Sequence, residues 1–311
     1  MSKKVIGIVA GLLVVVLIGA CALAAIAGIA LSGNRLPGRS GIAVIYVQGV
    51  IVSGDRPSGA LTASGQAYSD EIVRFLREAE ANRDVRAIVM RVDSPGGGVV
   101  ASDEIYQAMR QVSKPIVVSM GTLAASGGYF ISCAAREIVA NPNTLTGSIG
   151  VITVLPNVQG LLDKLGIKMI VLASGPHKEG GTFREFTEED RAIWDALIQE
   201  TYANFVAVVV EGRDMDEARV RELADGRVYT GEQAQALGLV DHLGNMDMAV
   251  ERAAALAGIR GTLRLIPYRP EPTFFEALFG AAIQRSPAED LAERLGLSDP
   301  FTMQYLFLGG R

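Results

Sequence analysis

Apolar residues fill the N-terminal part of the chain without interruption. From residue 5 to residue 31, 27 consecutive positions carry no charged side chain. As a helix this stretch would be about 40 Å long at ~1.5 Å per residue, which exceeds the ~30 Å hydrocarbon core of a bilayer. A surface helix of a globular domain would need a polar face, and this stretch has none. The pattern therefore predicts a transmembrane anchor over residues 5–31, preceded by a cytoplasmic stub over residues 1–4.

After a linker over residues 32–41, rich in Gly, Pro and Ser, short apolar runs alternate with amphipathic segments. The apolar runs predict buried strands, and the amphipathic segments predict helices. The strands are expected over residues 42–52, 85–94 and 115–120, and the helices over 69–81 and 102–112, with Ser102 as the N-cap of the second. Strands separated by helices are typical of a mainly parallel sheet covered on both faces. We therefore expect an α/β domain over residues 42–266.

A longer helix is predicted to start after Thr187, because three acidic residues follow this N-cap candidate in the first turn. The apolar positions that predict one buried face on it are Ile193, Trp194, Leu197, Ile198 and Phe205. Two shorter helices are expected over residues 215–224 and 231–237. The pattern weakens after Pro267, which leaves a C-terminal tail over residues 267–311.

The charges that flank the apolar span predict its orientation. Two lysines precede the span and two arginines follow it, and the free amino terminus adds positive charge to the first side. The positive-inside rule then places the rest of the chain on the extracytoplasmic side. A signal cleaved near "AIAG" at residues 25–28 and a lipid on Cys21 are alternatives. A cleavable signal has a shorter apolar region of ~7–15 residues, which favours the retained anchor.

The body of the chain is acidic. Beyond residue 41 it contains 25 basic and 34 acidic side chains. Nucleic-acid binding needs clustered cations, so this balance argues against it. Cys21 lies in the apolar span and Cys133 lies far from it, so the chain has no disulfide framework, and no Cys/His cluster has metal-ligand spacing. We expect neither a metal nor a cofactor.

Two glycine-rich turns follow apolar strands, and each turn opens a helix. "DSPGGG" over residues 93–98 lacks the Lys-Ser/Thr pair of a phosphate-binding loop and the spacing of a dinucleotide fingerprint. Backbone N–H groups at such a turn can instead stabilise an oxyanion. In "SGG" over residues 126–128, two poor helix formers follow Ser126, which is typical either of a loose loop or of a close approach of the backbone to a substrate. Ser126 is therefore the candidate nucleophile.

A serine nucleophile needs a base, and the chain offers two histidines and six lysines. His242 fits a surface turn, whereas His177 and Lys178 lie in a glycine-flanked loop, where functional residues concentrate. The other 23 basic residues are arginines, which do not lose their proton in proteins. Lys178 is the lysine without an evident structural role, although a lone loop lysine is more often solvated than catalytic. His177 is the rival base.

Four motifs in order resemble the signal peptide peptidase A family, peptidase family S49, in its short single-repeat form. They are "VDSPGGGVVASDEIYQAM", "SMGTLAASGGYFISCAAREIVANPNTLTGSIGV", "SGPHKEGGTFREFTEED" and "DGRVYTGEQAQALGLVDHLG". The resemblance covers about residues 42–258 and implies the ClpP/crotonase fold and a serine peptidase of the bacterial cell membrane. It implies hydrophobic peptides as substrates, chiefly the remnant signal peptides left after leader peptidase cleavage.

The resemblance also implies a Ser/Lys dyad, with Ser126 as nucleophile, Lys178 as general base and Ser148 orienting the lysine. The alanine that often precedes the histidine of the "G-x-H-K" motif is Pro176 here. Lysine has a reference pKa of ~10.4, so action as a base near neutral pH needs a depression of about three units. Burial and a hydroxyl acceptor such as Ser148 would favour the neutral amine.

The oxyanion hole implied by the resemblance consists of Gly97 and the Ser126 backbone, with Gly96 and Gly98 shaping the turn. The family further implies a homo-oligomer in which neighbouring subunits complete one another's active sites. A related Ser/Lys membrane peptidase of the SohB or stomatin-partner type is an alternative within this class. Outside it, the alternatives are an acyl-CoA-binding crotonase-like protein and an inactive scaffold.

Overall fold

The computed structural model describes residues 40–56, 65–261, 263–269 and 304–306. The expected stub and anchor, and all but the last two residues of the linker, lie outside these ranges, as does most of the C-terminal tail. None of the helices in the described ranges is long and apolar enough to span a bilayer.

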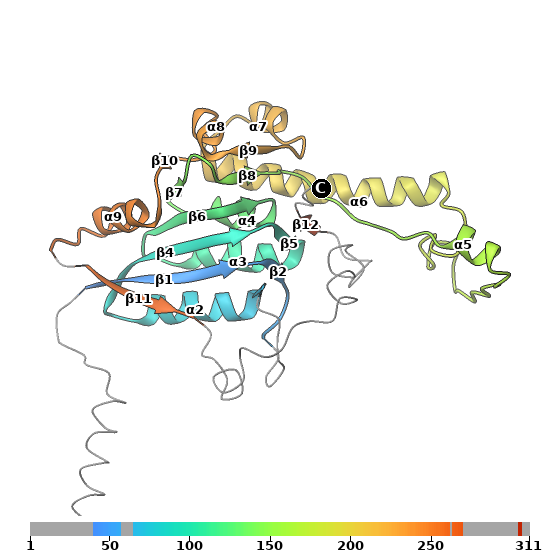
Figure 1. Ribbon diagram of the computed structural model, residues 1–311, viewed down its shortest axis with the longest axis horizontal. Helices are drawn as coiled ribbons and strands as arrows, with labels where there is room; N and C mark the ends of the chain where they lie inside the picture. Colours follow the sequence, from blue (N-terminus) through green and yellow to red (C-terminus); the bar gives the residue numbers. More distant parts are fainter. Residues whose placement is uncertain (1–39, 57–64, 262, 270–303, 307–311) are drawn as a thin grey trace, which may run out of the picture. The chain divides into compact units, whose positions relative to one another are not determined.

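The central layer is a mainly parallel sheet whose middle strands are β1 (Gly41–Gln48), β4 (Val85–Ser94) and β6 (Ile116–Ala125). Its strand order is β10-β7-β6-β4-β1-β11, and β8 pairs with both β6 and β9 (Figure 1). The outer strands are β7 (Glu137–Ala140), β8 (Leu145–Gly147), β9 (Val228–Thr230), β10 (His242–Leu243) and β11 (Arg264–Tyr268). β11 pairs in parallel with β1, so the sheet extends two residues beyond the boundary expected at residue 266.

A smaller sheet includes the three glycines of the turn over residues 93–98, which we call the glycine turn. Its strand order is β12-β5-β2-β3. Its strands are β2 (Val50–Val52), β3 (Gln66–Tyr68), β5 (Gly96–Gly98) and β12 (Gln304–Leu306). The apolar run predicted as one strand over residues 42–52 therefore divides at Gly49, which has a φ of 83° and connects β1 to β2 in different sheets. Such a φ is readily adopted by glycine, which lacks a Cβ.

Helices cover both faces of the central sheet, which explains why its middle strands are apolar on both sides. α2 (Ser69–Ala81), α3 (Val99–Gln111) and α4 (Gly127–Ser132) contribute to the larger core cluster. α9 (Met246–Leu256) covers the opposite face, where it packs with Ile42, Val89 and Val117. The remaining helices are α5 (Gln159–Lys164), α6 (Glu188–Arg213), α7 (Glu217–Leu223) and α8 (Gly231–Ala236).

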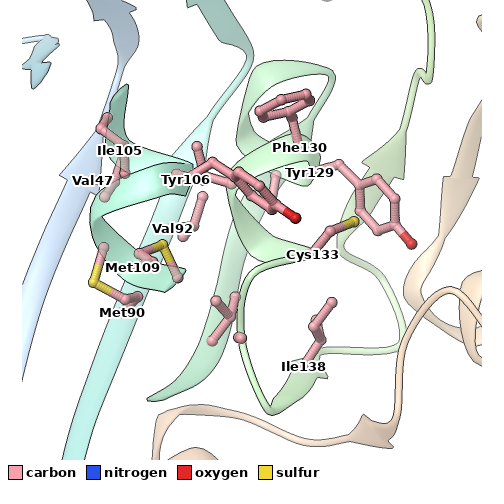
Figure 2. Packing of buried hydrophobic residues seen from close by; sticks show 14 of the residues in the cluster. Val47, Met90, Val92, Ile105, Tyr106, Met109, Tyr129, Phe130, Cys133 and Ile138 are labelled. Atoms are coloured by element: carbon pink, nitrogen blue, oxygen red, sulfur yellow. The ribbon is translucent and has the colours of Figure 1, made fainter. Parts of the chain in front are cut away.

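Three aromatic rings join α3, α4 and α6 in the larger core cluster. The ring of Phe130 lies 5.3 Å from that of Tyr106 (Figure 2) and 5.2 Å from that of Phe205, with the latter pair edge to face. All three side chains are buried. Edge-to-face pairs of this kind stabilise a core beyond the burial of their area. The C-terminal half of α6 is therefore fixed to the body of the domain.

The structure corrects two details of the predicted elements. Helix α3 begins at Val99 with Gly98 as its N-cap, so Ser102 lies inside the helix rather than at its start. Helix α6 has the expected Thr187 cap, but of its predicted apolar face only Phe205 is buried. Ile193 and Leu197 are each 40% exposed, because the N-terminal half of α6 extends beyond the sheet (Figure 1).

The aromatic contact of α6 gives a test of this packing. Replacing Phe205 by alanine removes a fully buried ring and should lower the free energy of unfolding by about 3–5 kcal/mol. The Phe205→Leu variant retains most of the apolar volume and should lose much less. Urea unfolding followed by circular dichroism measures both. Equal losses in the two variants would show that the ring does not anchor α6.

Candidate active site

Ser126 occupies the tight turn between β6 and α4. The strand ends at Ala125 and the helix begins at Gly127, so Ser126 is the N-cap, with φ 53° and ψ −117°. Positive φ is uncommon for a residue with a Cβ and is strained. Its side chain is only 1% exposed. The sharp reversal holds the serine at the carboxyl end of a parallel strand, where ligands of such sheets gather.

Ser148 lies beside this turn because β8 pairs in parallel with the end of β6. Ala125 is in register with Gly147, and the Ser126 N–H donates to the Gly147 carbonyl at 2.8 Å. Ser148 also has a positive φ, 51°, and its N–H donates to the Arg227 carbonyl at 2.8 Å. Two serines that are 22 positions apart in the sequence thus leave the sheet at the same edge with similar backbone strain.

Both serines line one hollow of about 490 Å³. Its other lining residues are Gly150, Val151, Ile152, Ile198, Gln199, Tyr202, Ala224, Asp225 and Gly226. Apolar side chains therefore form much of the wall, with Ile198 and Tyr202 contributed by the middle of α6. The Tyr202 hydroxyl donates to the Ala224 carbonyl at 2.9 Å, which fixes its ring at the wall. The hollow fits an apolar side chain better than a charged one.

The glycine turn lies against the first residues of α4. A Cβ added to Gly127 would lie 3.1 Å from the Gly96 Cα and 3.1 Å from the Gly97 nitrogen. A Cβ on Gly97 would lie 1.9 Å from the Ile51 carbonyl oxygen, so only glycine fits there. Backbone atoms of β5 and α4 can approach this closely because Gly96, Gly97 and Gly127 have no side chains.

The buried hydroxyl of Ser94 holds the glycine turn in place. It donates to the Gly49 carbonyl at 2.6 Å and accepts from the Gly96 N–H at 3.1 Å. Ser94 does not line the hollow, and its hydroxyl is already bound to two backbone groups. Ser94 is therefore structural, which leaves Ser126 and Ser148 as the serines of the site.

The backbone donors of the site differ from the expectation in one respect. The Ser126 N–H, expected to face an oxyanion, is occupied by the Gly147 carbonyl. The first N–H groups of any helix have no partner within it, and in α4 these belong to Gly127 and Gly128. The helix dipole adds partial positive charge at the same point. The N–H of Gly127, the residue that follows Ser126, is thus oriented by the start of α4.

The edge of β5 opposite β2 pairs with another strand. β12 pairs with it in antiparallel orientation, with Tyr305 opposite Gly97 and Leu306 opposite Gly96. β12 belongs to the segment expected as a C-terminal tail. An extended peptide backbone can therefore form ladder hydrogen bonds along the glycine turn, immediately beside Ser126.

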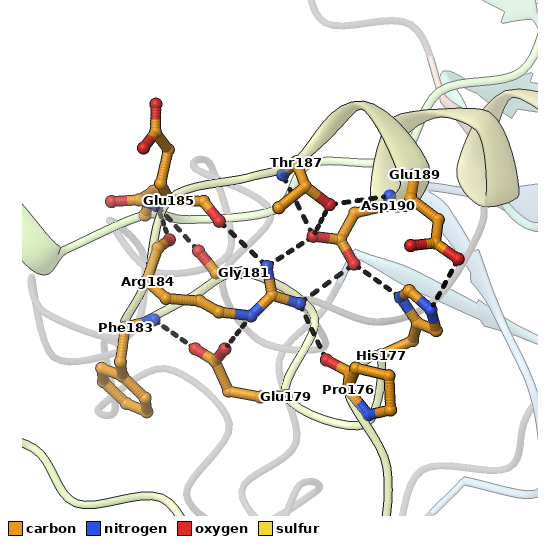
Figure 3. A network of polar contacts seen from close by, with 11 residues as sticks. Pro176, His177, Glu179, Gly181, Phe183, Arg184, Glu185, Thr187, Glu189 and Asp190 are labelled. Carbon is orange, nitrogen blue, oxygen red and sulfur yellow. Dashed lines mark hydrogen bonds and ion pairs between the residues drawn. The ribbon is translucent and has the colours of Figure 1, made fainter.

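Lys178 lies in the loop that precedes α6, and its side chain is exposed. A cluster of charged and polar residues surrounds its neighbours in the chain (Figure 3). His177 Nδ1 lies 3.0 Å from Asp190 Oδ1, and this contact raises the pKa of His177 above its ordinary value. Arg184, together with His177, holds the pKa of Asp190 well below its usual range. At neutral pH the cluster therefore favours the protonated form of His177.

The structure brings Ser126 and Ser148 together but places Lys178 elsewhere. The hollow that both serines line does not include Lys178, and its α6 contribution begins at Ile198. His177 contacts Asp190, which lies eight residues before Ile198, or roughly 12 Å along the helix at ~1.5 Å per residue. The turn of Lys178 therefore lies at the N-terminal end of α6, whereas the hollow of the same chain lies along the middle of α6.

Cys133 and His242 do not line the hollow. Cys133 is buried at the base of α4, and burial raises the pKa of its thiol to about 12, so it is not a reactive thiolate. His242 lies 3.3 Å from Glu137 in an ion pair away from the hollow. Within the described ranges, no group of three or more His, Cys, Asp or Glu side chains could hold a metal ion.

A strained serine at a strand-to-helix turn, beside a glycine turn on a mainly parallel sheet, is typical of serine hydrolases. Comparison with known proteins specifies the class further. The sequence pattern of peptidase family S49 matches residues 108–260, and that of Clp protease matches residues 61–146.

Individual relatives agree with these matches. A Synechocystis sp. protein provisionally named a protease is 42% identical over 224 residues, which cover 71% of this chain and 76% of that protein. Salmonella typhi Protease 4 is 39% identical over 76% of this chain, but the match spans only 37% of its length. An Enterococcus faecium protein provisionally named signal peptide peptidase SppA is 37% identical over 68% of this chain and 62% of its own. The chain belongs to peptidase family S49 and is a serine peptidase.

Sequence reasoning did not find the cluster around Asp190 or the pairing of β12 with β5. Asp190 was recognised only as an acidic residue of a first helical turn. A partial signal was present, because the spacing Thr187-x-x-Asp190 predicts a capping box, and the box is formed. No sequence pattern indicated that the same carboxylate also binds Arg184 and His177.

The two serines beside the glycine turn should respond differently to alanine. Ser94→Ala leaves the Gly49 carbonyl and the Gly96 N–H without their buried partner, so it should cost about 1–3 kcal/mol of stability. Ser126→Ala removes a hydroxyl that lines the hollow and has no hydrogen-bond partner among the described residues, so it should cost less stability than Ser94→Ala. Thermal unfolding of the two variants measures the contrast. The reverse order would mean that Ser126, and not Ser94, supports the fold.

Proposed function

We propose that this chain is a membrane-anchored serine endopeptidase with Ser126 as nucleophile and Lys178 as general base. The observation that carries the proposal is the backbone of Ser126, a buried residue with positive φ at the start of α4 and next to β5. Holding a serine in this conformation costs on the order of 1–3 kcal/mol, which a glycine would avoid. The strained conformation is explained if the turn presents the Ser126 hydroxyl to a substrate carbonyl.

The reaction follows from the groups at the turn. The neutral amine of Lys178 takes the proton of Ser126 Oγ as the oxygen attacks the scissile carbonyl. The N–H groups of Gly97 and Gly127 receive the developing oxyanion. Protonated Lys178 then gives its proton to the leaving amine. In the second half of the reaction, neutral Lys178 takes a proton from the water molecule that attacks the acyl-enzyme. It returns this proton to Ser126 Oγ as the acyl fragment leaves. Ser148, on the edge of the same hollow, orients the lysine amine through its hydroxyl.

A second copy of the chain supplies the lysine in this proposal. Residues 159–197, which we call the arm, carry Lys178 and do not line the hollow of their own chain. Seven large apolar side chains of the arm, within α5 and between α5 and Lys178, are exposed: Leu161, Leu165, Ile167, Met169, Ile170, Val171 and Leu172. An apolar patch of this kind is typical of an interface between proteins. In a homo-oligomer, docking of the arm on a neighbouring subunit would bury the patch and desolvate Lys178, which favours its neutral form.

Hydrophobic peptides are the proposed substrates. The hollow next to Ser126 has apolar walls, and the edge of β5 accepts an antiparallel strand, so an extended peptide can bind both at once. The anchor predicted over residues 5–31 would keep the domain at the extracytoplasmic surface of the bacterial cell membrane. The name of the Enterococcus relative agrees with signal peptides as substrates. We therefore propose remnant signal peptides as the main substrates.

Three variants test the dyad. Ser126→Ala should abolish cleavage of a hydrophobic reporter peptide while the domain stays folded. Lys178→Arg keeps the charge but cannot deprotonate at neutral pH, so it should be as inactive as Lys178→Ala. His177→Ala should retain substantial activity, because Asp190 raises the pKa of His177 and stabilises its cation, which is a poor base. An active Lys178→Arg with an inactive His177→Ala would instead establish a Ser/His mechanism.

Mixing two inactive variants tests whether subunits share sites. If each site combines Ser126 of one subunit with Lys178 of a neighbour, random co-assembly of Ser126→Ala with Lys178→Ala restores about one quarter of the sites. Peptide hydrolysis by the co-refolded mixture should then reach about that fraction of the unmodified protein. Each variant refolded alone is the control. A mixture that stays inactive, in an assembly shown by light scattering to contain both variants, would place the dyad within one chain.

A further inference from the structure

Arg184 holds the chain on both sides of Lys178. Its Nη2 donates to the Pro176 carbonyl at 3.0 Å, and its Nε lies 2.9 Å from Glu179 Oε2. Pro176 precedes Lys178 by two residues, and Glu179 follows it directly. The planar guanidinium thus binds the two flanks of the turn at once (Figure 3). Only an arginine has donors arranged for several acceptors in one plane.

Asp190 completes the hold from the first turn of α6. It accepts from Arg184 Nη2 at 3.0 Å and contacts His177 Nδ1 at 3.0 Å through the same oxygen, while its other oxygen accepts from the Thr187 N–H at 3.1 Å. Its side chain is 3% exposed. A carboxylate so buried needs compensating partners, and Arg184 and His177 provide them. The residue that directly precedes Lys178 is thereby fixed to the helix.

Lys178 itself is left out of this cluster. In the described part of the chain, no hydrogen bond or ion pair is formed by its ammonium group, and its side chain is exposed. Residues 176, 177 and 179 are held, whereas the amine is free to project from the turn. A turn with fixed flanks and one free cation differs from an ordinary solvated loop, in which neither the backbone nor the amine would be held.

We propose that Arg184 and Asp190 are positioning residues for Lys178, which they hold at a fixed place relative to α6. The proposal rests on the proposed function, in which Lys178 is the general base. It applies whether the lysine serves its own chain or a neighbouring subunit, because α6 carries both the turn and part of the wall of the hollow. Neither residue touches the substrate or the reacting atoms.

The expected effect follows from the sensitivity of proton transfer to distance. A displacement of about 1 Å at a reacting group can reduce the rate up to ~10²-fold. Asp190→Asn keeps an oxygen for the helix cap but loses the charge that binds Arg184 and His177. Arg184→Lys keeps the charge but cannot reach Pro176, Glu179 and Asp190 together. Both variants should therefore lower kcat about 10- to 100-fold with little change in KM.

Asp195→Asn and Arg191→Gln are matched controls, because both positions lie on α6 with exposed side chains. The experiment uses the full-length protein in detergent and a hydrophobic reporter peptide. Thermal unfolding and light scattering show that each variant is folded and assembled. The controls should keep the kcat of the unmodified protein. Loss of kcat in Asp190→Asn and Arg184→Lys, with folding and assembly retained, is the expected result.

Two further measurements separate positioning from general support of the fold. The acid limb of the kcat–pH profile should move to higher pH in both positioning variants, because a lysine released from its fixed place is better solvated and keeps its proton. The titration of His177, followed by NMR, should move down toward its reference value of ~6.5 in Asp190→Asn, which shows that the cluster is broken. Loss of folded protein alone would scale the profile without moving its limb.

The outcomes that overturn the proposal are distinct from those that overturn the dyad. If Lys178→Arg is inactive but Asp190→Asn, with its His177 titration shifted, keeps full kcat, then the dyad stands and the positioning role is wrong. A lower kcat with an unmoved acid limb would also reject positioning, since it indicates support of the fold. If Lys178→Arg is active, the dyad and the positioning role both fail.

Discussion

The hydrogen bond from the Ser126 N–H to the Gly147 carbonyl is the contact on which the site depends. It closes the ladder between β6 and β8 at the point where both strands end, so the next residue of each strand, Ser126 or Ser148, turns sharply away. Each serine adopts a positive φ, a strained conformation for a residue with a Cβ. Burial of apolar residues in the surrounding sheet and in α4 offsets the free energy of this strain.

The same packing explains the glycines around the nucleophile. β5 and the start of α4 approach so closely that a Cβ at Gly97 or Gly127 would contact backbone atoms of the neighbouring turn or strand. The close approach gathers backbone N–H groups beside Ser126 without any charged side chain. It also leaves the edge of β5 able to pair with an extended strand, as its pairing with β12 demonstrates. Both properties suit hydrolysis of a peptide bond.

Ser126 and the turn of Lys178 are held by different physical means. Ser126 is fixed by a close-packed core in which its neighbour Phe130 contacts Tyr106 and Phe205. The turn of Lys178 has little apolar support and is held mainly by ion pairs and hydrogen bonds to α6. A polar hold of this kind responds to pH and charge substitution more than a packed core does. The arm that carries this turn has exposed apolar side chains in place of a packed core.

Much of the architecture follows directly from local pattern. The apolar runs of β1 and β4, the helix α2 and the cap of α6 agree with the predicted elements, because their periodicity and caps act within a few residues. The extension of β6 from residue 120 to Ala125 was not predicted, since its last residues form strand by pairing with β8 and, at Ala124, with β4. Ser102 was predicted as a cap but lies inside α3, because Gly98 at the end of β5 already begins the helix.

The sequence by itself determined the candidates for chemistry: a serine before two glycines, a glycine turn after a buried strand, and a lysine in a chain whose basic residues are mostly arginines. Tertiary structure alone decided their distances. Strand pairing brought Ser126 and Ser148 to one hollow, whose wall includes the middle of α6. The turn of Lys178 lies instead at the start of α6, where Arg184, Asp190 and His177 form a cluster around it. The reason is physical: residue types fix the chemistry of each group, whereas proximity depends on pairing and packing between segments distant in the chain.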